Sequence, residues 1–140
     1  MGTVETFDHT ADVGLRVRGA DRDDLFRAAA EGVLDYIVVN RDQVRVVARE
    51  TVSLTADSPE ELLASWLNEL IFRCETTHRL YAEFQVHDSA DGLRLKAEIG
   101  GEPIDRARHV LDHEVKAVTH HGFTLHREGN GWLAEFILDI

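Results

Sequence analysis

The sequence predicts an α+β domain: a two-layer sandwich in which a mixed, mostly antiparallel sheet carries two helices on one face. Two segments have the apolar spacing of amphipathic helices, and much of the remaining chain alternates apolar and polar residues as half-buried strands do. The glycines and asparagine at 129–131 tolerate the positive φ of a tight hairpin, so the strands that flank them should be antiparallel. Because the strands alternate instead of being apolar throughout, we expect helices to cover only one face of the sheet.

The first predicted helix begins after Asp21, whose side chain can cap the helix, and Asp23 and Asp24 place negative charge in its first turn. Its apolar stripe recurs at helical spacing. The stripe consists of Leu25, Ala29, Val33 and Ile37.

The second predicted helix has a stronger start signal. Ser58 can cap it, Pro59 occupies the first turn where its missing N–H costs nothing, and Glu61 completes a capping box. The helix should end near Glu75, and its apolar face is predicted to lie in the core. This face includes Leu62, Trp66 and Leu70.

The predicted strands share a period of two, so each can bury one face. They are marked by residues 4–7, by Val13 to Val17, by Val44 and Val46 followed by Val52 and Leu54, by Phe84 and Val86, by Leu93 to Ile99, by Phe123 to His126, and by Trp132 to Leu138.

Length and composition indicate one domain over residues 1–140. The chain has 140 residues, 44% of them hydrophobic, and no Gly/Ser/Pro-rich linker. Its formal net charge of −11 argues against a general nucleic-acid binder and suits a basic partner or a cation. We find no apolar run long enough to span a membrane and no signal peptide at the start, so we expect a cytoplasmic protein.

A polar cluster at residues 8–12 allows two interpretations: a turn between strands, or an acidic metal or partner site. If this segment is extended, Asp8 and Asp12 are too far apart to bind one ion, and Asp12 needs metal co-ligands from elsewhere in the chain. Asp139 and the terminal carboxylate of Ile140 are candidates if the first and last strands are neighbours in the sheet. Three carboxylates would repel one another without a hard divalent ion, and Ca²⁺ fits such oxygen ligands. The alternative is that Asp139 is a solvated acid near the end of the chain.

A second cluster, at residues 114–122, contains Lys116, which could contact a phosphate or an acidic group of a partner, or be exposed on a strand. The sequence contains no nucleophile elbow, phosphate-binding glycine loop or dinucleotide fingerprint. The motifs therefore give only weak support for an enzyme.

Five segments, in order and spacing, resemble the archease family, the accessory proteins of RtcB-type tRNA-splicing ligases. They are residues 8–14, residues 66–70, Gly101-Glu102 with Asp105, residues 114–119 with His121-Gly122, and residues 137–140. The resemblance spans essentially the whole chain and implies an archease-like fold.

The resemblance also implies a function in tRNA splicing: activating the RNA ligase by promoting its guanylylation, so that it turns over many times and accepts a wider choice of nucleotides. The family's calcium site would fall on Asp12, Asp139 and Ile140. We expect Asp8, His9 and Lys116 to contact the ligase. The protein would contact RNA only indirectly, through the ligase. Two alternatives are a general protein chaperone and a small metal-dependent hydrolase with His9 as its base.

Overall fold

The computed structural model describes residues 2–9 and 12–140, and the side chains of all of these except Asp8 and His9. The elements in chain order are β1 (Thr3–His9), β2 (Asp12–Gly19), α1 (Arg22–Ile37), the 3-10 turn η1 (Arg41–Gln43), β3 (Ala48–Thr55), α2 (Pro59–Thr77), β4 (Arg79–Asp88), β5 (Arg94–Pro103), β6 (Ala117–Glu128) and β7 (Gly131–Asp139).

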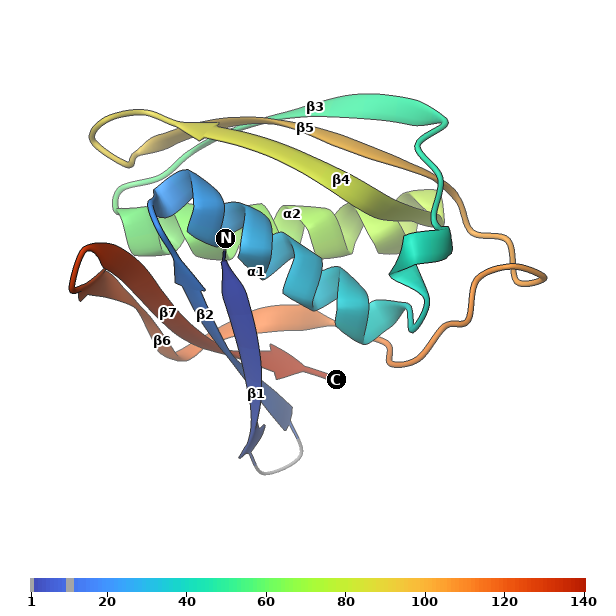
Figure 1. The fold of residues 1–140 in the computed structure, drawn as a ribbon, viewed down its shortest axis with the longest axis horizontal. Helices are drawn as coiled ribbons and strands as arrows, with labels where there is room; N and C mark the ends of the chain where they lie inside the picture. Colours follow the sequence, from blue (N-terminus) through green and yellow to red (C-terminus); the bar gives the residue numbers. More distant parts are fainter. Residues whose placement is uncertain (1, 10–11) are drawn as a thin grey trace.

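The strands form two sheets, where the sequence predicted one. The first has the order β1-β2-β7-β6 and the second the order β3-β5-β4, and every strand pairing among the described residues is antiparallel. Both helices lie between the two sheets (Figure 1). The α+β class with two helices is confirmed, but the molecule has three layers, with a sheet on each side of the helices.

Three layers form because the helices are apolar on more than one side. Trp66 of α2 is fully buried and its Nε1 donates a hydrogen bond to the Phe26 carbonyl oxygen of α1 at 3.0 Å. The same indole meets the Phe84 ring of β4 edge-on, with 6.3 Å between ring centroids. A helix buried in this way needs an apolar surface on both sides, and each sheet supplies one of them.

Both predicted helix starts are confirmed by their capping bonds. The Asp21 side chain accepts a hydrogen bond from the Asp24 N–H at 2.8 Å, and Ser58 Oγ accepts one from the Glu61 N–H at 3.1 Å. The C-terminal hairpin is confirmed too, since Glu128 pairs with Gly131 and Gly129 has a φ of 59°.

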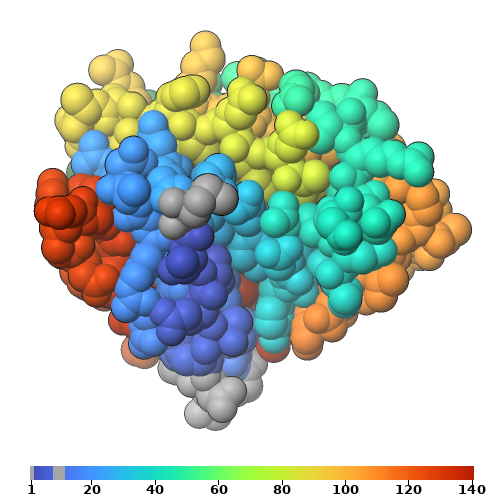
Figure 2. Space-filling view, viewed as in Figure 1, coloured from blue at the N-terminus to red at the C-terminus, as the bar shows by residue number. Residues whose placement is uncertain are grey.

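The early and late parts of the chain meet in the first sheet. Strand β7 lies between β2 and β6, and Val13 pairs with Leu138. Strand β6 is irregular, because its register against β7 shifts between Thr119 and Thr124, and Gly122 there has a φ of 70°. Figure 2 shows β4, α1 and β1 side by side on one surface of the molecule, with residues 104–116 at its edge. In the part of the chain that the structure describes, we find no helix with the length and apolar character that a membrane span requires.

Candidate metal and partner site

The register of β2 and β7 brings Asp12 and Asp139 to the same end of the first sheet. Asp12 begins β2, Asp139 ends β7, and the neighbouring pair is Val13 with Leu138. The Leu138 side chain is buried against the helices. Since side chains alternate along a strand, Asp12 and Asp139 lie on the opposite, outer face, at the spacing of cross-strand neighbours, about 5 Å between Cβ atoms.

Lys116 reaches the same end of the sheet from the other side of β7. Its backbone N–H donates to the Asp139 carbonyl oxygen at 2.8 Å, and the following residue, Ala117, pairs with Asp139. The backbone of Lys116 therefore lies at the sheet end that holds Asp12 and Asp139, and Ile140 follows Asp139 directly; we call Asp12, Asp139 and Lys116 at this end of the sheet the row.

The predicted partner residues Asp8 and His9 belong to β1. In the ladder, Asp8 pairs with Val13 and His9 pairs with Asp12. Strands β1 and β2 are therefore antiparallel neighbours up to the pair His9 and Asp12. The side chains of Asp8 and His9, and residues 10 and 11, lie outside what the structure describes.

The donor set at this end of the sheet suits a hard cation. Asp12 and Asp139 offer carboxylate oxygens, as would a terminal carboxylate on Ile140, and such ligands are typical of Ca²⁺ and Mg²⁺ rather than Zn²⁺. Among the side chains that the structure describes, which do not include those of Asp8 and His9, no three His, Cys, Asp or Glu side chains group closely enough to hold a metal. The candidate site therefore depends on a main-chain carboxylate as its third ligand.

Asn68 of α2 fixes the start of β6 next to this row. Its Oδ1 accepts a hydrogen bond from the Val118 N–H at 2.8 Å, and its Nδ2 lies 3.5 Å from the Val118 carbonyl oxygen. The Asn68 amide thus bonds to the Val118 backbone as a neighbouring strand would, at a point two residues after Lys116. The sequence carries no local signal for this role, because the neighbouring Glu69 is equally polar.

Glu102, at the end of β5, is the other polar residue whose importance the sequence analysis missed. Its side chain is 6% exposed, and it accepts hydrogen bonds from Arg108 Nη2 at 2.5 Å, from the Arg45 N–H at 2.7 Å and from His109 Nε2 at 3.0 Å. His109 Nδ1 accepts from the Asp105 N–H, so the ring proton must be on Nε2, which donates to Glu102.

The hydrogen bonds from Arg108 to Glu102, with those from the Arg45 N–H and His109, outweigh the effect of burial and lower the pKa of Glu102 to about 2. Glu102 is therefore ionised at neutral pH, and its charge holds the segment that leads to Lys116 against β5 and the turn after η1.

Comparison with known proteins identifies relatives over the whole chain. The model of the Archease protein family (MTH1598/TM1083) matches residues 5–140. The protein archease of Methanopyrus kandleri is 36% identical over 140 residues, which cover 97% of this chain and 98% of the relative. The protein archease of Thermococcus gammatolerans is 33% identical over 145 residues and is covered completely, as is this chain.

Two solved structures share the fold. The solution structure of Methanobacterium thermoautotrophicum protein 1598 is 31% identical, with a TM-score of 0.80 and 98% of each chain covered. The crystal structure of an archease, possible chaperone, from Thermotoga maritima is 15% identical, with a TM-score of 0.65, covering 97% of this chain and 96% of that one. At this identity the second likeness concerns the fold alone.

Proposed function

The chain belongs to the archease family, and from this premise we propose that it activates an RtcB-type tRNA-splicing RNA ligase in the cytoplasm. In this proposal it promotes guanylylation of the ligase, so that each ligase molecule completes many ligations and accepts a wider choice of nucleotides. It catalyses no reaction of its own. The observation that carries the proposal is the row formed by Asp12, Asp139 and Lys116 at one end of the first sheet.

The same row supports a cation site. Asp12, Asp139 and the terminal carboxylate of Ile140 would hold a divalent ion such as Ca²⁺, and the ion would supply positive charge among three carboxylates that otherwise repel one another. The chain's own part is to position these groups: the β2–β7 ladder sets the spacing of the two aspartates, and the Lys116 N–H holds the Asp139 backbone.

The charges of the chain suit the partner. A ligase that binds GTP and RNA phosphates needs a basic pocket, and this chain carries a formal net charge of −11. Opposite charges raise the rate of encounter and orient the two surfaces. In the proposal, Asp8, His9 and Lys116 contact the ligase at the rim of that pocket, and RNA is contacted only through the ligase.

The decisive measurement is ligation with limiting ligase, with and without this protein. We expect several ligations per ligase molecule only when the protein is present. One ligation per ligase in both reactions would overturn the proposal. Suppressed aggregation of unrelated proteins, without any effect on the ligase, would favour the chaperone alternative.

Matched variants test the row. The chain has two lysines, so Lys116→Gln should abolish most of the activation while Lys96→Gln, on β5 of the other sheet, should not. Likewise Asp139→Asn should reduce activation, whereas Glu98→Gln, an exposed carboxylate on β5, serves as its control. Equal activation by both members of each pair would remove the row from the mechanism.

Ion binding is tested separately by a calcium titration of the isolated protein. Coulomb's law at the dielectric of water makes one carboxylate charge at a distance of ~2.4 Å from Ca²⁺ worth about 3.5 kcal/mol, which is roughly three hundredfold in affinity. Asp12→Asn, or a C-terminal tag that turns the Ile140 carboxylate into an amide, should weaken binding by about that factor. An N-terminal tag should not, and equal affinity for the two tagged proteins would contradict the role of Ile140.

A further inference from the structure

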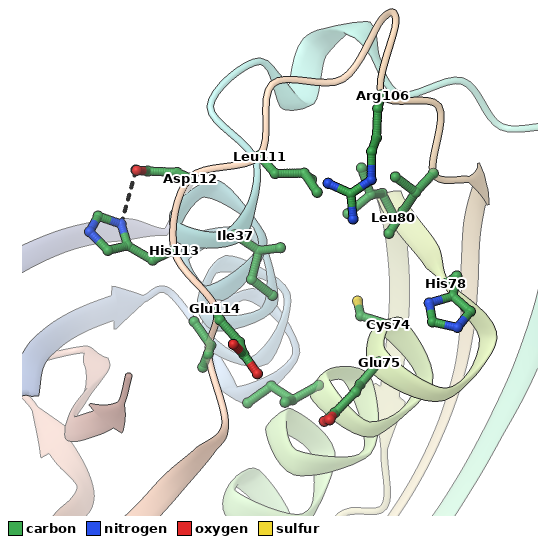
Figure 3. Close-up of a pocket in the computed structure, with 13 residues that line it drawn as sticks. Ile37, Cys74, Glu75, His78, Leu80, Arg106, Leu111, Asp112, His113 and Glu114 are labelled. Atoms are coloured by element: carbon green, nitrogen blue, oxygen red, sulfur yellow. Dashed lines mark ion pairs between the residues drawn. The ribbon is translucent and has the colours of Figure 1, made fainter.

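A pocket of about 360 Å³ lies between the C-terminal ends of both helices and residues 104–115, the segment that leads to Lys116. Its floor is apolar and buried: Ile71 is 3%, Leu80 0% and Val115 5% exposed. Figure 3 shows the Cys74 sulfur directed into the same space. Burial raises the pKa of this thiol to about 12, so Cys74 contributes apolar surface and no nucleophile. The volume is in the range of small-molecule sites.

The charged groups of the pocket are separated by sign. Glu75 from α2 and Glu114 from the segment before β6 lie on one side, and Arg106 extends its guanidinium over the opposite side, between Leu111 and Leu80 (Figure 3). The third acid of the lining, Asp112, is paired with His113 at 3.1 Å.

We propose that this pocket binds a small organic cation with an apolar body, of the class of aromatic or aliphatic amines. The ammonium lies between Glu75 and Glu114, and the apolar body covers the half-buried side chains of Ile37 and Leu111, above the buried floor. Arg106 repels a cation at its end of the pocket and so fixes the orientation of the ligand. A small anion is disfavoured by the two carboxylates and by the net charge of the chain, and a purely polar cation would leave the apolar floor uncovered.

This inference is independent of the proposed function, so the isolated full chain is tested. The probes are a cation and an anion that share the phenylbutyl body: 4-phenylbutylamine and 5-phenylvalerate. The methyl groups of Ile71, Leu80 and Val115 report on the floor in a ¹H–¹³C NMR titration. We expect saturable shifts with the amine and binding of the acid that is weaker by roughly tenfold or more. Methyl signals that do not move with the amine, or an acid that binds as tightly, would overturn the proposal.

Three substitutions of exposed rim or surface residues complete the test. Glu75→Gln should weaken amine binding several-fold, and Arg106→Gln should tighten it while weakening the acid further. Glu60→Gln, in the first turn of the same helix and outside the pocket, should leave both affinities unchanged. If Glu75→Gln behaves as Glu60→Gln does, the acidic side of the pocket has no role and the assignment is wrong.

Discussion

Replacing Asn68 by Ala should loosen the start of β6, next to Asp139. The side chain of Asn68 accepts the Val118 N–H at 2.8 Å, and Val118 is 3% exposed. In Asn68→Ala this N–H has no partner from α2, and water reaches it poorly. The second contact of the amide, at 3.5 Å to the Val118 carbonyl oxygen, is too long to contribute much.

The expected magnitude follows from two opposing effects. Leaving a buried N–H unpaired costs about 1–3 kcal/mol. Alanine favours the helix over asparagine by about 0.5 kcal/mol, which offsets part of that cost. The net loss in the free energy of unfolding is about 0.5–2.5 kcal/mol, and a local opening of the same size speeds exchange of the Val118 amide by roughly 2-fold to 60-fold.

Native-state hydrogen exchange with urea unfolding measures both quantities. Asn40→Ala is a matched control, because Asn40 also clamps backbone with both ends of its amide: Oδ1 accepts from the Val110 N–H at 2.8 Å, and Nδ2 donates to the Arg108 carbonyl oxygen at 2.9 Å. Both variants should lose stability, but only Asn68→Ala should deprotect Val118 beyond the global change.

The result that would refute this reasoning is an Asn68→Ala protein in which Val118 is as protected as in Asn40→Ala. The Val118 N–H would then be held by β7 or by water, and the helix would have no part in positioning β6. The proposed activation of an RNA ligase provides a second readout, since a looser start of β6 should impair it in Asn68→Ala more than in Asn40→Ala.

Three further predictions concern stability. A Cβ on Gly101 would overlap the Leu80 carbonyl oxygen of β4, so Gly101→Ala should cost about 3 kcal/mol in urea unfolding, and Gly100→Ala, whose Cβ meets only movable side chains, about 1 kcal/mol. Because the pKa of Glu102 is lowered from 4.5 to about 2, its contribution to stability is complete above pH 4.5 and is lost as the pH falls toward 2; Glu102→Gln should therefore flatten the decline of stability between pH 5 and 2. Burial and a neighbouring carboxyl raise the pKa of Asp23 from 3.8 to about 6, so its contribution is present below pH 3.8 and lost as the pH rises through 6; Asp23→Asn should match the wild type at pH 4 and exceed its stability at pH 8. A Gly100→Ala protein less stable than Gly101→Ala, or variants whose pH profiles parallel the wild type, would contradict these assignments.

Features set by neighbouring residues were predictable from the sequence. The caps at Asp21 and Ser58 need only the next three residues, and the hairpin at 129–131 needs only its own turn. The division into two sheets was not predictable, because a period of two looks the same in either sheet. The expected strand at Val44 and Val46 also failed, since these valines follow η1 and precede β3.

The same distinction between local and long-range features applies to the residues of the candidate site. Asp12, Asp139 and Lys116 were chosen for their chemistry, and the structure brings them to one end of a sheet. Glu102 and Asn68 were overlooked because their importance depends on partners far along the chain or across a layer. Glu102 bonds to Arg45, 57 residues away, and Asn68 bonds to Val118, 50 residues away. No local pattern distinguishes them from exposed polar residues.

The position of β7 inside its sheet has a consequence for damaged or unfinished chains. β7 pairs on one side with β2 and on the other with β6, and Leu138 is 125 positions from its partner Val13. If β7 is missing or clipped, both neighbouring strands present unpaired backbone, and the apolar faces that they share with the helices lose their cover. Exposed edge strands of this kind pair with strands of other chains and so promote aggregation. A proteolytic cut in the turn at 129–130 should therefore produce aggregates rather than a smaller folded protein.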